Sequence, residues 1–487
     1  MAYIYGDRNS RTLFPSSVEE YVSESDPVRV YDAFVDNLDI KGLGIIISAA
    51  PQVGAPNYDP IAMLKLLVYG YSYGIRSSRK LERACYHNIS FIWLLGGLKP
   101  DHKTISEFRR NNRKVLKKVL NQCVRLCMRL GLIDGNVLFV DGSKIRANAS
   151  LDNSWSKERC EKYLEKLDEK IEELLRACDE IDKSEAGELS LVKLKEELLG
   201  KEKLQQEVKA ILGEIEEKEV KSVNTVDRDS VNSKGRQGSH AYFNAQLVTD
   251  GKKGLIVNTD VISQSNDTNQ FSCQIKEAEV VLEKEAETAS SDSGFWQLDD
   301  LEKISSRGTQ VVVPSKKQAS HKDIGRFDKE NFKYEEESDE YVCPAGNRLR
   351  FNRIVEKDRC REYIIKSNKT CINCKHYGEC TKSRLGRRIN RLFTEELKNK
   401  LEKVYASGEG QRIYRMRKAR VELPFGYIKR DLGADHFLLR GLEGVNGEMG
   451  LLASSFNLKR MMNLIGISAL LDFLRGNKTA SEVGCLG

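Results

Sequence analysis

The stretch "NVLFVDGSKIRANAS", residues 136–150, decides the fold class of this chain. Residues 137–140 form a short apolar run that is typical of a buried strand. The run ends on Asp141, and two cations, Lys144 and Arg146, follow closely. We expect the strand to end at Asp141, at the edge of a sheet, where a carboxylate could bind a hard divalent cation. The alternative is that Asp141 caps a turn, because Asp-Gly-Ser is also a turn sequence.

Composition places the chain among folded proteins with a basic balance. It has 487 residues, 40% of them apolar and 31% charged, which is enough for about three domains and excludes overall disorder. The net charge is +7, with acidic residues concentrated in 158–220 and basic residues in 76–80, 109–118 and 382–391. Basic faces favour a polyanion such as nucleic acid as partner, although exposed lysine and arginine are also ordinary surface.

Targeting and membrane segments are not evident. The first residues, "MAYIYGDRNSRTLFPSS", lack the apolar core of a signal peptide, and we find no run of about 18 apolar residues. We therefore expect a cytoplasmic protein without a membrane partner. Its 12 cysteines should be reduced or bound to metal.

Residues 1–130 are predicted to be mostly helical. Asp59 is a candidate N-cap with Pro60 at the first helical position, and apolar residues follow at helical spacing. Short basic helices in 76–83 and 100–118 are compatible with a DNA-binding domain, or with an ordinary helical bundle. The apolar residues expected to face the core are Met63, Leu66, Leu67 and Tyr71.

Residues 155–220 carry a heptad pattern that predicts a helical hairpin. The seam is interrupted by "DKSEAGELS" (182–190). We expect the hairpin to have a structural role or to contact another protein, rather than to take part in catalysis. The seam residues are Cys160, Leu164, Leu167, Ile171, Leu174, Cys178 and Ile181, then Leu204, Val208, Ile211 and Ile215.

The segment after the hairpin predicts the rest of a mixed α/β sheet. Residues 223–240 are polar and suggest a linker. Two strands, 241–250 and 254–263, then form a β-hairpin, and a helix at 296–306 precedes a buried strand at 309–315.

Two further carboxylates are candidates for chemistry. Asp292 in "SSDSGFWQLDDL" could be a ligand or only a helix N-cap. Phe295 and Trp296 beside it could stack on a base, although core packing is the simpler role. Glu422 lies in "YRMRKARVELPFGYIKR", with cations one turn before and Lys429 two turns after it, so it could bind metal or form surface ion pairs.

The chain resembles the DDE-class transposases of bacterial insertion sequences, in the group with a Tyr-Arg-Glu-Lys signature. "YDPIAMLKLLVYGYSYGIRSSRKLE" and "PDHKTISEFRR" are similar to their N-terminal domain, and "LFVDGSKIRANAS", "SDSGFW" and "RMRKARVELPFGYIKR" to the segments with their three acidic residues. The resemblance implies an RNase H-like core in which Asp141, Asp292 and Glu422 are catalytic and bind two Mg²⁺ (or Mn²⁺) ions.

The resemblance also implies a reaction and partners. The protein would bind the terminal inverted repeats of its element, cleave the ends by hydrolysis, and join the 3′ hydroxyl to target DNA. It would act as a homodimer associated with the bacterial nucleoid. The residues implied to contact DNA are Tyr414, Arg417, Lys418, Lys429, Lys144 and Arg146.

This sequence departs from the family pattern in two places. The arginine and the glutamate are five positions apart rather than four, so either Arg417 or Lys418 could contact phosphate. The segment before Asp292, "EAETASSD", is less apolar than a core strand, which leaves Asp260 and Asp267 as alternatives. Rival hypotheses are a non-catalytic DNA-binding relative that keeps the fold, and a coiled-coil assembly protein.

A cysteine-rich segment could bind one structural zinc ion. Cys371 and Cys374 form a C-x2-C pair, and Cys343 and Cys380 complete a set of four. Cys360 and His376 are substitutes, and free buried thiols are the alternative. The other cysteines expected in the core are Cys85, Cys123, Cys127, Cys160, Cys178 and Cys273.

These patterns together divide the chain into four segments, two of which belong to one catalytic core. We expect a helical DNA-binding domain at 1–130 and the first part of the catalytic core at 131–330, with the hairpin inserted at 155–220. A Cys-rich insertion would occupy 331–390. The second part of the core, with the glutamate helix, would occupy 391–475.

Overall fold

The computed structural model describes residues 17–45, 57–184, 188–235, 238–320 and 325–476. The chain forms two compact units. Unit 1 comprises Met1–Asp267, Cys273–Ala286 and Arg417–Gly487, and unit 2 comprises Thr268–Ser272 and Glu287–Met416.

Unit 1 begins with short helices, as the sequence predicted. The side chain of Asp59 accepts hydrogen bonds from the amides of Ile61 and Ala62 (3.1 and 3.3 Å), and Pro60 is the first residue of the helix that follows. This N-cap fixes where the apolar face begins, and the four predicted core residues of this helix are buried. The helices are η1 (Val18–Tyr21), α1 (Val28–Asp36), α2 (Ile40–Leu43), α3 (Pro60–Ser72), α4 (Ser78–His87), α5 (Ile89–Leu94), α6 (His102–Asn111) and α7 (Arg113–Arg129).

The sheet of unit 1 is built on one long strand, β5 (Gly238–Asp250). β5 pairs antiparallel with β1 (Val137–Arg146) along one edge, and with β4 (Val231–Gly235) and β6 (Ile256–Ile262) along the other. The predicted hairpin of two strands is therefore β5–β6. β5 is buried over almost its whole length, so it forms the centre of this core.

The predicted end of the first strand at Asp141 was wrong. β1 continues through Arg146, because the backbone of residues 142–146 finds antiparallel partners in β5, from Gln246 to Tyr242. A run of polar side chains does not end a strand when a neighbouring strand satisfies its backbone. Asp141 therefore lies in the middle of β1.

The predicted polar linker at 223–240 was also wrong. It contains β4 and part of a two-stranded sheet, in which β3 (Ser222–Asn224) pairs with β2 (Ser154–Ser156). Its polar side chains make hydrogen bonds within the fold: Asn224, which is buried, donates to Ser154 Oγ at 2.9 Å and to the carbonyl of Ser150 at 2.8 Å. Polar composition alone did not distinguish such a segment from a loop.

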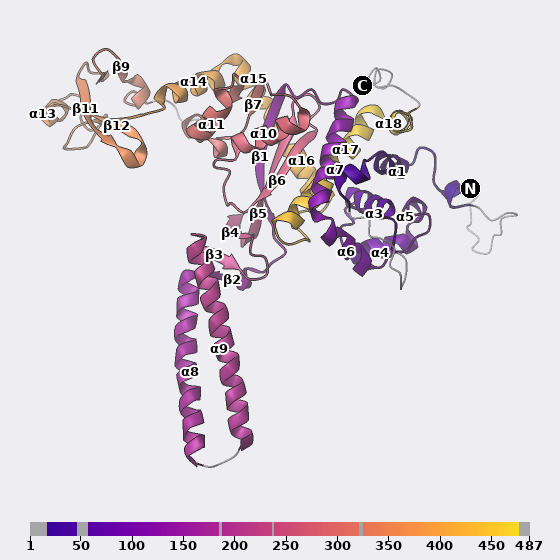
Figure 1. Cartoon of the computed structure of the whole chain (residues 1–487). Helices are drawn as coiled ribbons and strands as arrows, with labels where there is room; N and C mark the ends of the chain where they lie inside the picture. Colours follow the sequence, from indigo (N-terminus) through magenta and orange to yellow (C-terminus); the bar gives the residue numbers. More distant parts are fainter. Residues whose placement is uncertain (1–16, 46–56, 185–187, 236–237, 321–324, 477–487) are drawn as a thin grey trace, which may run out of the picture. The chain divides into compact units, whose positions relative to one another are not determined.

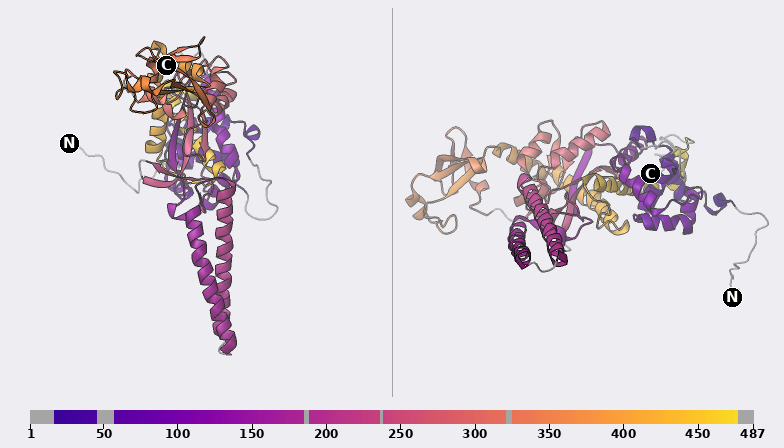
Figure 2. Two further views of the ribbon diagram at one scale, coloured as in Figure 1. Left: turned by 90° about the vertical axis from the view of Figure 1, so that its left-hand side faces the viewer. Right: turned by 60° about the horizontal axis from the view of Figure 1, so that its bottom comes forward.

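Two long helices, α8 (Lys157–Ser184) and α9 (Glu188–Glu217), pack side by side. Figure 1 shows them as an antiparallel pair that extends from the small β2–β3 sheet. Both views in Figure 2 also show the two helices side by side. At their base a hydrophobic cluster joins α8, α9 and β3, and its buried residues are Cys160, Val208, Ile211, Ile215 and Val223. Residues 185–187, within the predicted break of the heptad seam, lie outside the described residues.

The long C-terminal helix α17 (Leu442–Ile465) is almost entirely buried and packs on α3, α7 and β6. Two of its asparagines bind the free edge of β6. Asn446 exchanges two hydrogen bonds with the backbone of Val261 (both 3.0 Å), and Asn457 does the same with Ile256 (2.8 and 2.7 Å). The eleven positions of helix from Asn446 to Asn457 span about 16.5 Å, and so do the five positions of strand from Ile256 to Val261. The spacing of the two asparagines therefore matches the spacing of their backbone partners on β6.

Two further helices of unit 1 are α10 (Phe271–Leu282), whose first two residues belong to unit 2, and α18 (Ile467–Leu474). Of the expected core cysteines, Cys273 on α10 is exposed and that prediction was wrong, whereas the other five are buried. Across the described parts of the chain, no helix combines the length and the apolar character that crossing a bilayer requires.

Unit 2 contains a parallel strand pair and a separate antiparallel sheet. β7 (Thr288–Ser290) and β8 (Gln310–Val312) are parallel, with η3 (Ser293–Phe295) and α11 (Leu298–Ser305) between them. β7 is fully buried although its sequence is polar. The helices that follow are α12 (Lys316–Ala319), η4 (Lys329–Asn331), α13 (Asn368–Ile372), α14 (Glu395–Ala406) and α15 (Gly408–Arg417).

The antiparallel sheet of unit 2 carries the cysteine-rich segment. Its strands are β9 (Lys333–Glu335), β10 (Glu340–Val342), β11 (Arg348–Val355), β12 (Cys360–Ile365) and β13 (Arg388–Leu392). They lie in the order β13-β12-β11-β10-β9, and η5 (Glu356–Asp358) connects β11 to β12. A hydrophobic cluster of five buried residues stabilises this sheet: Phe332, Tyr341, Leu349, Tyr363 and Ile389.

A buried ion pair connects the N-terminal helices of unit 1 to α17. Arg76, just before α4, contacts Glu448 at 2.7 Å, and the two side chains are 5% and 0% exposed. Arg76 also donates to the carbonyls of Gly433 and His436. The second oxygen of Glu448 accepts hydrogen bonds from the amides of residues 438 and 439 (2.9 and 3.0 Å). Both charged groups thus make several hydrogen bonds, and these offset the free-energy cost of removing the charges from water.

Replacing Glu448 with alanine should lower the free energy of unfolding by about 3–5 kcal/mol, because it leaves Arg76 as an unpaired buried charge. Urea denaturation followed by circular dichroism measures this change. The matched control is Glu443→Ala on the same helix, where the carboxylate is 44% exposed and pairs with Arg113 and Lys114. Glu443→Ala should lower the free energy of unfolding much less, since exposed ion pairs contribute little to stability. Equal losses would contradict the role given to Glu448.

Candidate active site

Two of the three predicted carboxylates converge on one cation. In unit 1, Arg417 lies 3.6 Å from Oδ1 of Asp141 on β1 and 4.0 Å from Oε1 of Glu422. Asp141 and Arg417 are nearly buried (14% and 13% exposed), whereas Glu422 is 49% exposed. Two carboxylates so placed repel each other unless a positive charge lies nearby, and Arg417 supplies it here.

The unusual spacing between Arg417 and Glu422 has a structural explanation. After α15, the chain forms a π-helical turn, η6 (Lys418–Glu422), then α16 (Leu423–Gly426) and a second π-helical turn, η7 (Tyr427–Asp431). A π-helical turn pairs residues five apart, where an α-helix pairs residues four apart. The extra residue is therefore accommodated in η6, and Arg417 still contacts Glu422. Lys418 is exposed.

Two of the other predicted DNA-contacting cations of unit 1, Lys429 and Lys144, donate hydrogen bonds to protein groups. Lys429 on η7 donates to Oγ of Ser143 (2.6 Å) and to the carbonyl of Lys144 (2.9 Å), on the same strand as Asp141. The amine of Lys144 donates to Ser233 on β4. The backbone of Arg146 bonds to the segment 435–437. Lys429 thus holds the glutamate segment onto β1.

Asp292 and Tyr414 lie in unit 2. Asp292 lies two residues after the end of β7, and its Oδ1 accepts a hydrogen bond from the amide of Gly294 at 2.8 Å, so it caps η3. Phe295 is fully buried, in line with a packing role, and Trp296 is partly buried. The ring of Tyr414 packs edge-on against Tyr405.

The two alternative aspartates have other partners. Asp260 forms an ion pair with Lys117 at 3.0 Å. Asp267 accepts hydrogen bonds from the amides of Asn244 (2.9 Å) and Gln246 (2.6 Å), and it lies against the Cα of Gly142. Successive residues of a strand face opposite sides, so Asp267 lies on the other face of the sheet from the side chain of Asp141.

Some residues of this region escaped the sequence-based prediction. Asn244 and Gln246 are buried polar residues on β5, and Ser143 is the partner of Lys429. The sequence pattern could have identified Asn244 and Gln246. In "AYFNAQLV" these polar residues are two positions apart inside an apolar strand, which predicts a polar network on one face of the sheet.

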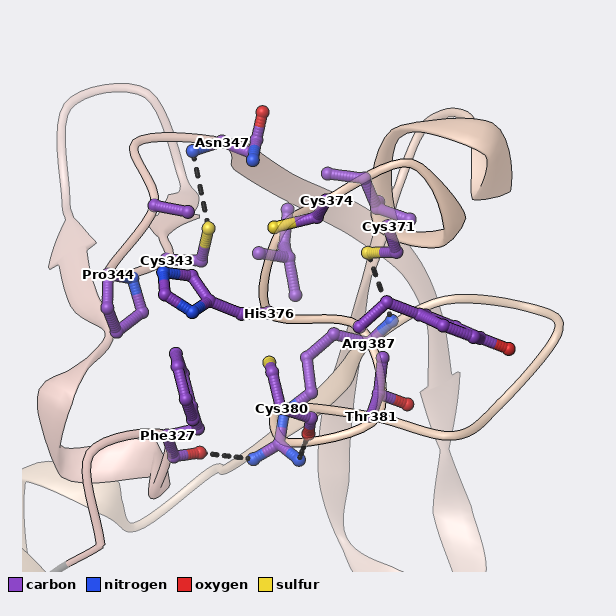
Figure 3. Close-up of a pocket in the computed structure, with 14 residues that line it drawn as sticks. Phe327, Cys343, Pro344, Asn347, Cys371, Cys374, His376, Cys380, Thr381 and Arg387 are labelled. Atoms are coloured by element: carbon purple, nitrogen blue, oxygen red, sulfur yellow. Dashed lines mark hydrogen bonds between the residues drawn. The ribbon is translucent and has the colours of Figure 1, made fainter.

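The four predicted zinc ligands lie around one cavity in unit 2. Cys343, Cys371, Cys374 and Cys380 line it together with His376 (Figure 3). Cys360 lies at the opposite end of β12 from Ile365, which lines the cavity. Throughout the described residues, no group of three or more His, Cys, Asp or Glu side chains stands in an arrangement that could hold a metal ion without movement.

Comparison with family models gave two matches. Residues 16–111 match a transposase domain (DUF772), and residues 342–462 match a transposase DDE domain. The second match includes the cysteine-rich segment, Arg417 and Glu422, whereas Asp141 and Asp292 lie outside both matched ranges. No curated protein and no solved structure matches the chain.

Gly142→Ala tests the close packing beside Asp141. A Cβ at position 142 would lie 2.1 Å from Oδ1 of Asp267 and 2.6 Å from Nε2 of Gln246, so these hydrogen-bonded groups must move. We expect a loss of about 1–3 kcal/mol in the free energy of unfolding, measured by urea denaturation. In the control Gly200→Ala, on α9, the added Cβ meets nothing within 4 Å, and stability should not fall. A loss in the control as large as that in Gly142→Ala would contradict this account.

Proposed function

For this DDE-class transposase of the insertion-sequence type, we propose that Asp141, Asp292 and Glu422 form the catalytic carboxylate set of an RNase H-like core. The enzyme would bind the terminal inverted repeats of its element, cleave the ends by metal-dependent hydrolysis, and join the freed 3′ hydroxyl to target DNA. The family-model matches support the transposase function. The assignment of the residues is our inference.

One observation carries the proposal: Arg417 contacts both Asp141 and Glu422. These carboxylates come from segments far apart in the sequence, and ordinary packing has no need to bring two negative charges together. The support for Asp292 is its place two residues beyond the end of the buried strand β7, which belongs to a parallel pair. Ligands commonly bind beyond the carboxyl ends of parallel strands.

The donor types fit the divalent cations of such an enzyme. Mg²⁺ and Mn²⁺ prefer carboxylate oxygens, and Asp141, Asp292 and Glu422 would hold them. When bound, a pair of such ions supplies an activated oxygen nucleophile and stabilises the leaving oxygen of a phosphodiester. Arg417 balances the carboxylate charge and keeps the side chains of Asp141 and Glu422 in place.

The remaining residues of the site would position the DNA. Lys418 is exposed beside Glu422, and Tyr414, Lys144 and Arg146 are further candidates for phosphate contacts. Lys429 has a different role in this proposal: through Ser143 and the carbonyl of Lys144, it fixes the distance between the glutamate segment and β1.

The N-terminal helices would bind the ends of the element. Arg79, Lys80 and Arg83 on α4 are all exposed and form a basic face, whereas Arg109 on α6 is buried and donates to Tyr71 and to the carbonyl of Arg76. Two ends must be held together during transposition, so we propose a homodimer in the DNA complex, in the bacterial cytoplasm near the nucleoid.

The proposal predicts that Asp141→Ala and Glu422→Ala each lower the rate of end cleavage by at least about a thousandfold, as expected for groups on which the chemical step depends. The substrate is a plasmid that carries the ends of the element, assayed with Mg²⁺, with Mn²⁺ and with chelator. A gel-shift assay should show that both variants still bind the ends.

Asp260→Asn and Asp267→Asn are matched controls, because these carboxylates have other partners, and both variants should keep cleavage. Cleavage that survives in Asp141→Ala and Glu422→Ala but is lost in Asp267→Asn would move the active site to the other face of the sheet. End binding without cleavage under any metal would favour the alternative function, a DNA-binding relative that lacks catalysis.

A second prediction concerns the basic face of α4. Each of Arg79→Ala, Lys80→Ala and Arg83→Ala should weaken end binding and reduce the slope of log K against log salt concentration by about 0.9 if that cation contacts a phosphate. Arg176→Ala is the control, since Arg176 is exposed on α8 and pairs with Glu172. Fluorescence anisotropy at several salt concentrations measures the slopes, and an unchanged slope in all three α4 variants would exclude this face.

A further inference from the structure

We propose that Cys343, Cys371, Cys374 and Cys380 bind one Zn²⁺ ion that stabilises the antiparallel sheet of unit 2. This site is separate from the carboxylates and does not depend on the proposed catalytic function. The four thiols come from the β10–β11 turn, from α13, and from the loop after α13, and they surround one cavity (Figure 3). Four thiolates are a common ligand set of structural zinc.

The turn at Cys343 directs a backbone amide at its sulfur. The amide of Cys343 donates to the carbonyl of Asn347 (2.9 Å), and the amide of Gly346 donates to the carbonyl of Cys343 (2.8 Å). In this tight turn, the amide of Asn347 donates to Sγ of Cys343 at 3.3 Å. This hydrogen bond holds the sulfur of Cys343 in place at the cavity.

Cys371 is held in the same way by a second tight turn. The amide of Arg387 donates to its Sγ at 3.5 Å, and the amide of Cys374 donates to its carbonyl at 3.1 Å. Gly386 makes the approach of Arg387 feasible: its φ is +83°, and an added Cβ would lie 2.6 Å from Ile365 and 3.4 Å from Sγ of Cys371. Two separate turns thus place amide donors at two of the four sulfurs.

Cys380 lines the same cavity as the other three cysteines. The cavity has a volume of about 30 Å³, which is above the minimum that holds a water-sized particle. It therefore has room for one ion.

Binding requires a movement of the cysteine side chains. A Zn–S bond of about 2.3 Å in a tetrahedron puts sulfurs roughly 3.8 Å apart, and the described residues include no group of three ligands in such an arrangement as they stand. All four cysteines are only partly buried and form no disulfide, so their side chains can rotate toward the ion.

Two other candidate ligands have different roles. The ring of His376 packs on Phe327 with centroids 4.9 Å apart, and its Nδ1 lies 3.7 Å from Glu379, so it borders the cavity without completing the set. Cys360 pairs with Val355 and Leu392 at the far end of its strand, about 16 Å along the strand from Ile365. It is therefore a matched control for the four ligands.

The sheet also needs such a cross-link on energetic grounds. Its core consists of five buried residues, which is small for a sheet of five strands. Small units with so little apolar burial are usually stabilised by disulfides or a metal ion. A bound zinc would add its binding free energy to the stability of this part of the protein.

The test is the metal content of the full-length protein, purified without chelator and measured by inductively coupled plasma mass spectrometry. We expect one zinc per chain, retained in Cys360→Ser and His376→Ala and lost in Cys371→Ser and Cys374→Ser. Replacing the ion with Co²⁺ should give the intense visible absorption of tetrahedral cobalt thiolate, which reports the ligand set in the folded wild-type chain.

Because a ligand variant could fail to fold, a second measurement uses wild type alone. A mercurial thiol reagent should release the zinc stoichiometrically, as detected by a chromogenic chelator. Wild-type protein without zinc, or with disulfides among these four cysteines, would overturn the proposal, as would loss of zinc in Cys360→Ser equal to that in Cys371→Ser. The catalytic assay is not involved, so this result is independent of the carboxylate proposal.

Discussion

The buried contact between Arg76 and Glu448 is the interaction on which the architecture of unit 1 depends. It joins the N-terminal helices to α17, and the same carboxylate holds the amides of residues 438 and 439. The segment just before these amides pairs with the backbone of Arg146 at the end of β1. The strand that carries Asp141 is thereby tied to the N-terminal helices through one charge pair. Such a pair is costly to desolvate, and the hydrogen bonds around both ions offset this cost.

The geometry around Asp141 follows from a division between the two faces of β1. Asp141 and Ser143 face the glutamate segment, where Arg417 and Lys429 hold them. The opposite face, at Gly142, packs against Asp267, Asn244 and Gln246. Negative charge is thus distributed over both faces, each balanced by its own donors. The π-helical turn η6 maintains the contact on the first face although the sequence has one residue more than an α-helix would require.

The sequence predicted local features well where a side chain acts on its own backbone. The cap at Asp59, the β5–β6 hairpin and the heptad pattern of α8 and α9 depend on neighbouring residues, and all three features appear in the structure. The end of β1 was placed wrongly because the partner of residues 142–146 lies about a hundred residues away in β5. β4 was missed for a different reason: its partner, residues 238–242 of β5, is close in the sequence, but the polar composition of the segment predicted a linker.

For the candidate site, the sequence identified the residue types but not their partners. Arg417 contacts two carboxylates, and Lys429 holds β1 through Ser143 and the carbonyl of Lys144. The sequence could not specify these partners, because they depend on tertiary distances. The DNA contacts expected of both cations and the catalytic assignment of Asp141, Asp292 and Glu422 stay predictions.

The asparagines of α17 have a consequence for how this protein can assemble. An open sheet edge is a template for strand exchange and aggregation, and proteins normally cover it with a loop, a bulge or charges. Here the side-chain amides of Asn446 and Asn457 imitate the missing neighbour strand at Ile256 and Val261, so that a helix ends the growth of the sheet. A second copy of the chain cannot add a strand at this edge without displacing α17 from the core. The helix therefore protects β6 from strand pairing with another chain as long as α17 stays packed.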